Sequence, residues 1–156
     1  MKFSALVVVG NGKGKYGFAN CKASEVPDAI KKSVAKAARN TYQFEIVKND
    51  SIAHETIGKF GATSVFLKPA PEGTGIIAGG PVRAILELSG VKNVVSKVYG
   101  AKSAVNIIQA THVALSQLKS YRKVWELRGK TVHEVTPTEV AAKVAFNKRF
   151  QRKEGK

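Results

Sequence analysis

The chain has 156 residues, 44% of them hydrophobic, and its 26 Lys and Arg against 11 Asp and Glu give a formal net charge of +15. A chain with this apolar content and length can fill the core of one ordinary domain or two small ones, which excludes wholesale disorder. No apolar run approaches the ~20 residues of a membrane span, and a single cysteine excludes an internal disulfide, so we expect a soluble, cytoplasmic protein whose partner is a polyanion, with nucleic acid first.

The first predicted element is a strand over Phe3–Val9, whose near-continuous apolarity indicates burial on both faces. Asn11-Gly12 follows as a favoured hairpin-turn pair, because both residue types tolerate positive φ. Lys15–Lys22 is the predicted returning strand. A hairpin with lysines at its tip can contact a phosphate backbone.

The same stretch also matches the dinucleotide fingerprint G-x-G-x-x-G, with Gly12, Gly14 and Gly17 at the required spacing. That fingerprint needs a helix that starts at the glycines and an acidic residue about 20 positions further on. Here a strand is predicted to follow, and the ribose-binding acid is missing from that context. We therefore interpret the stretch as a phosphate-binding hairpin, and a nucleotide-dependent enzyme using Gly12–Gly17 is the enzyme-class alternative.

A helix is predicted next, from an N-cap at Ser24 to about Asn40. Its apolar residues recur at helical spacing and indicate a seam that faces the core: Val26, Ile30, Val34 and Ala37. Its basic residues fall on the more exposed surfaces: Lys31, Lys32, Lys36 and Arg39. Such lysines usually lie on a solvated face, but beside a basic hairpin they are similar to the phosphate grip of double-stranded-RNA-binding modules.

After a polar boundary near residues 48–51, the middle of the chain is predicted to run strand, strand, helix, strand, helix in an α+β layer arrangement. The predicted elements are strands at Ile52–Ile57 and Thr63–Lys68, a helix opened by Gly79-Gly80-Pro81 and stopped by Gly90, a strand at Val94–Tyr99, and a helix from Ser103 to Leu118.

The loop Gly73-Thr74-Gly75, taken with Gly79-Gly80, has two interpretations. It is either an anion-binding nest ahead of the following helix or a tight crossover in which a Cβ atom would clash.

Nothing in the chain points to catalysis or to a bound metal or cofactor. The three histidines, His54, His112 and His133, lack metal-ligand spacing, and Cys21 alone cannot complete a zinc site. No carboxylate pair recurs in a way that suggests acid–base chemistry. Beyond Lys119 the charge rises again, and Pro137–Arg152 is predicted to be helical.

Three stretches resemble the small-subunit ribosomal protein S-five family, bacterial type. They are FSALVVVGNGKGKYGFANCKASEVPDAIKKSVAKAARN (Phe3–Asn40), GKFGATSVFLKPAPEGTGIIAGGPVRAILELSGVKNVVSKVYG (Gly58–Gly100) and SAVNIIQATHVAL (Ser103–Leu115). The resemblance implies an α+β fold in three parts. A double-stranded-RNA-binding-like domain covers residues 1–50, a C-terminal β-β-α-β-α domain of the family's own type covers residues 51–118, and a basic extension covers residues 119–156.

The resemblance also implies a function without catalysis: a structural constituent of the small ribosomal subunit that binds its rRNA, assists assembly and influences translational accuracy near the mRNA entry path. The implied partners are rRNA and ribosomal proteins S-four and S-eight, with no membrane and no homo-oligomer. The implied rRNA contacts are Asn11, Gly12, Lys13, Gly14, Lys15, Tyr16, Lys22, Lys31, Lys32, Lys36 and Arg39. Gly75 and Arg83 would lie towards S-four, and a free-standing double-stranded-RNA-binding regulator is the alternative.

One departure from the family concerns the N-terminus. Family members usually begin with a basic segment that includes a first strand, whereas here only Met1-Lys2 precedes Phe3. We therefore expect an N-terminal sheet without that strand, whether the lineage lacks it or the sequence is shortened.

Overall fold

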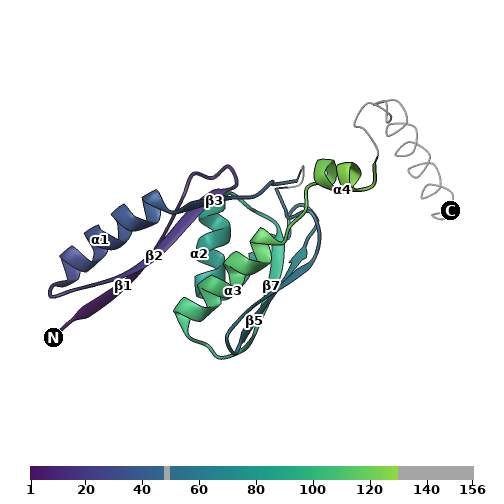
Figure 1. Ribbon diagram of the computed structural model, residues 1–156. Helices are drawn as coiled ribbons and strands as arrows, with labels where there is room; N and C mark the ends of the chain where they lie inside the picture. Colours follow the sequence, from purple (N-terminus) through teal and green to yellow (C-terminus); the bar gives the residue numbers. More distant parts are fainter. Residues whose placement is uncertain (48–49, 130–156) are drawn as a thin grey trace. The chain divides into compact units, whose positions relative to one another are not determined.

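A computed structural model describes residues 1–47 and 50–129 of the chain (Figure 1). The chain divides into two compact units, Met1–Lys119 and Ser120–Lys156. In the second unit the structure describes helix α4 (Tyr121–Leu127), whose N-cap Ser120 Oγ accepts a hydrogen bond from the backbone N–H of Lys123. The helix predicted at Pro137–Arg152 lies outside the described residues. Within those residues, no helix combines the length and the apolarity that crossing a membrane requires.

The first sheet is antiparallel and has the order β1-β2-β3. Its strands are β1 (Phe3–Gly10), β2 (Lys15–Ala23) and β3 (Thr41–Gln43). The predicted hairpin is confirmed, with Phe3 paired to Ala23 at one end and Gly10 to Tyr16 at the other. The burial predicted for both faces of its first strand is wrong, because β1 is an edge strand and none of its residues is buried. The three-residue strand β3 was not predicted.

Helix α1 (Val26–Arg39) runs along β1 and β2 (Figure 1). Two details of its prediction are wrong. Its N-cap is Glu25 rather than Ser24, and no side chain forms a cap hydrogen bond. The residues that it buries are the small ones, Ala29, Ser33 and Ala37, of which only Ala37 was predicted.

Three of the four residues of the predicted apolar seam of α1 do not face the core, since Val26, Ile30 and Val34 are 42–47% exposed, whereas Ala37 is buried. The reason is the close approach of the helix to the sheet. Ser33 Oγ donates to the carbonyl oxygen of Ala5 at 2.9 Å, and a Cβ atom on Gly17 would collide with the carbonyl oxygen of Ala37. Only small side chains fit into that space.

The second sheet has the order β4-β5-β7-β6, with β6 parallel to β7 and the other pairs antiparallel. Its strands are β4 (Thr56–Phe60), β5 (Thr63–Pro69), β6 (Ile76–Ile77) and β7 (Val94–Gly100). The strand expected at Ile52–Ile57 is displaced, because regular pairing starts only at Thr56. Ile52 is nevertheless buried, so its apolarity reflects core packing. The two-residue strand β6 was not predicted.

Two predicted helices are confirmed, α2 (Gly80–Ser89) and α3 (Ala104–Ser116). Helix α3 packs on β4 and β5, whereas α2 contacts α3, the edge strand β6 and β1 of the first sheet. Gly79 is the N-cap of α2, Pro81 occupies its first turn, and Gly90 ends it in the left-handed conformation at φ +93°. Ser103 is the N-cap of α3, although its side chain forms no cap hydrogen bond.

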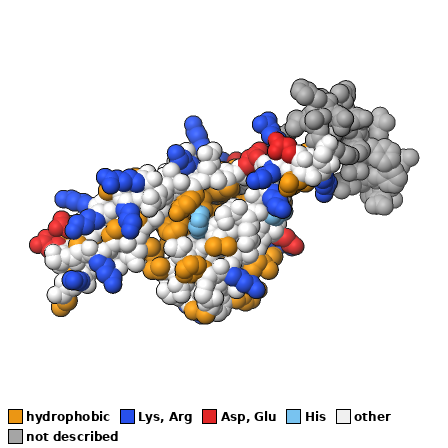
Figure 2. Space-filling model, viewed as in Figure 1, with side chains coloured by type: hydrophobic (Ala, Val, Ile, Leu, Met, Phe, Trp, Pro, Cys, Tyr) orange, Lys and Arg blue, Asp and Glu red, His pale blue; other side chains and the backbone are white. Residues whose placement is uncertain are grey.

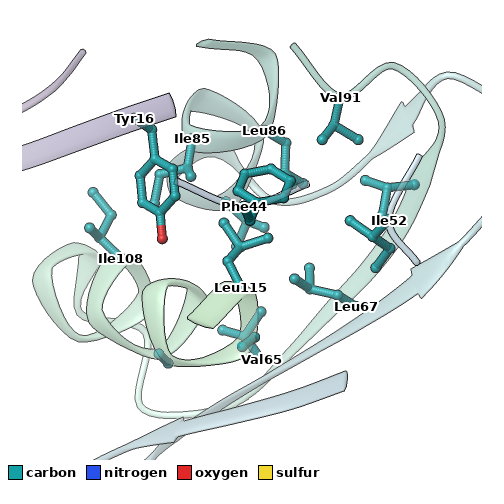
Figure 3. Packing of buried hydrophobic residues seen from close by; sticks show 14 of the residues in the cluster. Tyr16, Phe44, Ile52, Val65, Leu67, Ile85, Leu86, Val91, Ile108 and Leu115 are labelled. Atoms are coloured by element: carbon teal, nitrogen blue, oxygen red, sulfur yellow. The ribbon is translucent and has the colours of Figure 1, made fainter. Parts of the chain in front are cut away.

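One hydrophobic cluster joins the two sheets within Met1–Lys119 (Figure 3). Tyr16 and Phe44 come from the first sheet region and pack with residues of the second, among them Ile85, Leu86 and Leu115. The β1–β2 hairpin is therefore held by the same core as α2 and α3.

Candidate nucleic-acid interface

The hairpin loop Asn11–Gly14 is built around the side chain of Asn11. Asn11 Oδ1 accepts hydrogen bonds from the backbone N–H of Lys13 at 2.9 Å and of Lys15 at 3.1 Å. The loop therefore has four residues rather than the two of the predicted turn. Of the predicted turn pair, only Gly12 has a positive φ (+68°).

The loop is docked on the C-terminal end of α2. The N–H of Gly12 donates to the carbonyl of Leu88 at 2.9 Å, and the N–H of Gly14 donates to the carbonyl of Ser89 at 2.7 Å. Gly14 is buried, and a Cβ atom on it would collide with the carbonyl oxygen of Phe44. Protein acceptors occupy both amides, but only Gly14 is also buried, so Gly14 packs inside the protein whereas Gly12 stays exposed.

Tyr16 also differs from its prediction as an RNA contact. It is 2% exposed, and its hydroxyl lies 2.8 Å from Nδ1 of His112 in α3. Its ring contacts those of Phe44 and Tyr42 at centroid distances of 6.0 and 5.9 Å. Burial raises the pKa of Tyr16 and lowers the pKa of His112, so the Tyr16 hydroxyl stays protonated and His112 is biased towards its neutral form. Tyr16 is therefore a core residue, and its aromatic neighbours were not anticipated because they lie far away in sequence.

The predicted basic contacts are all on the surface. Seven of these side chains are exposed: Lys13, Lys15, Lys22, Lys31, Lys32, Lys36 and Arg39. Among the described residues none of them forms an ion pair. Figure 2 shows Lys and Arg side chains gathered over the region of α1. This set, together with exposed Asn11 and Gly12, is called the basic hairpin–helix surface below.

The basic hairpin–helix surface is extended rather than gathered into one pocket. Lys15 stands at the loop end of β2, while Lys22 pairs with Ser4 near the opposite end. Lys22 follows Lys15 by seven residues, which corresponds to about 23 Å along the strand. Because this separation is odd, the two side chains leave opposite faces of the sheet, so they cannot bind one small anion together.

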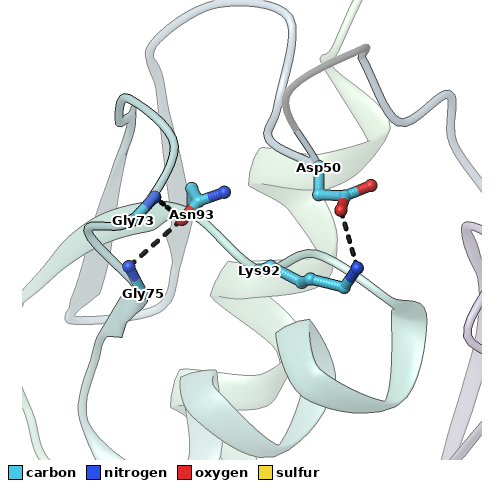
Figure 4. A network of polar contacts seen from close by, with 5 residues as sticks. All are labelled: Asp50, Gly73, Gly75, Lys92 and Asn93. Atoms are coloured by element: carbon cyan, nitrogen blue, oxygen red, sulfur yellow. Dashed lines mark hydrogen bonds and ion pairs between the residues drawn. The ribbon is translucent and has the colours of Figure 1, made fainter.

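The loop before α2 is filled by a side chain of the protein itself (Figure 4). Asn93 Oδ1 accepts hydrogen bonds from the N–H groups of Gly73 and Gly75, both at 3.2 Å. The amides of the anticipated nest therefore already have an acceptor. The interpretation as a tight crossover is wrong as well, because nothing lies within 4 Å of a Cβ atom added to Gly73 or Gly75. Both residues have a positive φ, +91° and +74°, and this conformation favours glycine. Asn93 was missed by the sequence analysis because no local pattern links it to a loop 18 residues earlier.

The described residues form two exposed ion pairs. Arg83 Nε donates to Glu87 Oε1 at 2.7 Å along α2. Lys92 Nζ donates to Asp50 Oδ2 at 2.7 Å, and that hydrogen bond, with the nearby charge, raises the pKa of Lys92 (Figure 4). Arg83 thus remains on the surface as expected, but with a local partner.

The histidines are engaged within the protein rather than grouped around a metal. His54 Nε2 accepts the backbone N–H of Lys119 at 3.1 Å, and His112 bonds to Tyr16. His133 lies outside the described residues. In the described ranges, no group of three or more His, Cys, Asp or Glu side chains is placed to hold a metal ion.

Comparison with known proteins gives the family. The model for ribosomal protein S5, N-terminal domain, matches residues 1–45, and that for ribosomal protein S5, C-terminal domain, matches residues 58–128. Small ribosomal subunit protein uS5 of Syntrophobacter fumaroxidans is 48% identical over 133 residues, covering 85% of this chain and 80% of the relative. The uS5 proteins of Idiomarina loihiensis and Mycoplasma pneumoniae are 49% and 50% identical, with 85% and 86% of this chain and 80% and 61% of the relatives covered. Matches of this identity and extent, on an α+β fold with the predicted hairpin and helices, show that the chain belongs to the ribosomal protein S5 family.

Proposed function

We propose that this chain binds small-subunit rRNA through the basic hairpin–helix surface, and so assists subunit assembly and translational accuracy near the mRNA entry path. The S5 family is one of structural ribosomal proteins, so the chain is not an enzyme. The observation that carries the proposal is the set of seven exposed Lys and Arg residues without ion-pair partners among the described residues. Each such cation that meets a phosphate releases a condensed counterion.

The proposed protein partners of the chain are ribosomal proteins S-four and S-eight, with Gly75 and Arg83 on the S-four side. Arg83 is exposed on α2, and Gly75 lies in the 73–75 loop that precedes β6 and this helix. The ion pair of Arg83 with Glu87 is solvent-exposed and worth less than about 1 kcal/mol, so a partner carboxylate can replace it. Residues 1–50, 51–118 and 119–156 are proposed as the functional divisions of the chain.

The proposed RNA-binding role of the hairpin loop is tested by removing its two positive charges. Lys13→Gln with Lys15→Gln is expected to weaken binding of the full chain to small-subunit rRNA and to lower the slope of log affinity against log salt by about 1–2. Lys2→Gln with Lys102→Gln removes two exposed charges that belong to neither proposed RNA-binding surface, and is the matched control. Equal affinities for the two double variants would show that the loop has no special role.

A second measurement separates a ribosomal protein from a free RNA-binding regulator. The chain is expected to sediment with small subunits through a high-salt wash. Recovery only in the fraction free of ribosomes contradicts the ribosomal function, whatever the affinity for naked RNA.

A further inference from the structure

The second sheet has two different faces. Its inner face packs on α3 so closely that a Cβ atom on Gly58 of β4 would collide with the carbonyl oxygen of Ala110. Val65, Leu67 and Val94 point to the same side and are fully buried. Side chains alternate along a strand, so the residues between these form the other face. This outer face consists of Ile57, Lys59, Ser64, Phe66, Lys68, Ile77, Val95, Lys97 and Tyr99.

The register of the strands orders the outer face into three rows that run across the sheet, each with one lysine. The rows are Lys59–Ser64–Tyr99, Ile57–Phe66–Lys97 and Lys68–Val95–Ile77. Adjacent rows are two residues apart along each strand, which is about 7 Å. The outer face therefore carries a regular line of positive charge across an apolar and aromatic surface, and none of its nine residues is acidic.

Most of the outer face is exposed in the described part of the chain, while Ser64, Phe66 and Val95 are half-buried. Tyr99, Ile77 and Ile57 are 57%, 55% and 52% exposed, which is high for large apolar side chains. Lys59, Lys68 and Lys97 form no ion pair with any described residue. Ile57 and Phe66 also line a surface pocket together with Lys119 and the acidic Glu55.

The chemistry of the outer face selects its partner. An apolar protein surface would bury three lysines without carboxylates to pair them, which is unfavourable. A base-paired duplex offers phosphates but keeps its bases stacked away from aromatic side chains. A single strand offers both, because its phosphates meet cations while its unstacked bases lie on aromatic rings.

We propose that the outer face binds a single-stranded segment of RNA, with bases stacked on Tyr99 and Phe66 and phosphates beside Lys59, Lys68 and Lys97. The proposal rests on the proposed function in that RNA is the partner, but it uses other residues and another form of RNA. Phe66 and Tyr99 lie on β5 and β7, the two central strands of the sheet, in adjacent rows. Two consecutive bases can therefore stack on neighbouring positions.

The experiment compares two probes with the full chain, a labelled oligouridine of about 12 nucleotides and an RNA duplex of about 20 base pairs. Fluorescence anisotropy gives the affinity for each. Tyr99→Ala is expected to weaken oligouridine binding about 5- to 150-fold, the range for loss of one base–aromatic stack, and to leave duplex binding unchanged. Lys97→Gln is expected to lower the salt slope for oligouridine by about 0.7.

Three matched variants sharpen the result. Tyr99→Phe keeps the aromatic ring and should bind oligouridine like the wild type, while Tyr99→Leu keeps apolar area without a stacking ring and should bind like Tyr99→Ala. Tyr121→Ala removes a tyrosine of similar exposure, 62%, that is not one of the nine residues of the outer face, and it should have no effect.

Several outcomes overturn the proposal. Unchanged oligouridine affinity in Tyr99→Ala does so, and so does an equal loss in Tyr121→Ala. If Tyr99→Leu binds as tightly as the wild type, the face recognises apolar area and a protein is the better partner. The proposed function fails separately, when loss of Lys13 and Lys15 leaves rRNA and duplex binding intact.

Discussion

The hydroxyl of Tyr16 lies 2.8 Å from Nδ1 of His112 and ties the β1–β2 hairpin to helix α3 across 96 positions of the chain. With the Nε2–H tautomer of His112, the tyrosine donates this hydrogen bond. The two rings also meet edge to face at a centroid distance of 6.1 Å. The contact joins the hairpin that carries Lys13 and Lys15 to the packing of the second sheet.

Tyr16→Phe is expected to lower the free energy of unfolding by about 1–2 kcal/mol, because a part-buried ring nitrogen of His112 loses its donor. Chemical denaturation measures this difference. Tyr42→Phe is the matched control, since Tyr42 packs in the same aromatic group but is 39% exposed. A loss in Tyr42→Phe as large as that in Tyr16→Phe would assign the effect to general packing.

Acidification is expected to weaken the same contact. Burial lowers the pKa of His112 in the folded chain below its unfolded value of about 6.5. Between these two pKa values the unfolded chain binds more protons, so the free energy of unfolding falls as the pH drops through this window. The folded chain must then hold a partly buried imidazolium beside Tyr16.

Denaturation of the wild type and of His112→Gln at about pH 7.5 and about pH 5 isolates this contribution from that of the carboxylates. The wild type should lose more stability than the variant over this interval. Parallel losses in the two proteins would contradict a depressed pKa for His112.

Gly14→Ala is expected to cost about 2–4 kcal/mol, because a left-handed residue is strained and the new methyl group overlaps the backbone of Phe44. Gly12→Ala is the control. Gly12 also has a positive φ, but nothing lies within 4 Å of an added Cβ, so only about 1 kcal/mol of strain remains. Thermal or chemical denaturation compares them, and equal losses would refute the packing role of Gly14.

Asn93→Ala is expected to release the 73–75 loop and to lower the free energy of unfolding by about 1–2 kcal/mol, since two N–H groups lose their acceptor. Hydrogen exchange at Gly73 and Gly75 should accelerate more than exchange in α3. Lys92→Ala removes only an exposed ion pair and should cost less than about 1 kcal/mol. Unaltered exchange at both glycines would show that Asn93 does not hold the loop.

Elements whose signals are local were predictable from the sequence. Gly79, Pro81 and Gly90 mark both ends of α2, and the structure places the helix between them. The hairpin was predictable for the same reason, because two β-rich segments flank a short polar loop. The exposure of Lys13 and Lys31 follows from the cost of burying a charge.

The features that escaped prediction depend on distant partners. In α1, Val26–Ile30–Val34 and Ala29–Ser33–Ala37 have the same spacing, and only the distance to β1 and β2 selects the small set for burial. Strands β3 and β6 are too short for a periodic signal and exist because β2 and β7 offer free edges. From the sequence, Gly12 and Gly14 of the hairpin loop could equally be RNA contacts or packing residues. In the structure, the carbonyl groups of Leu88 and Ser89 accept their N–H groups.

The docking of the loop on α2 has a consequence for synthesis. The last acceptor that the loop uses, Ser89, follows Gly14 by 75 residues (89 − 14). At translation rates of about 5–20 residues per second, the loop leaves the peptidyl-transferase centre about 4–15 s before its anchor does. During that interval Lys13 has no fixed position relative to the second sheet. The newly made chain therefore acquires a rigid basic tip only after its α2 segment has emerged.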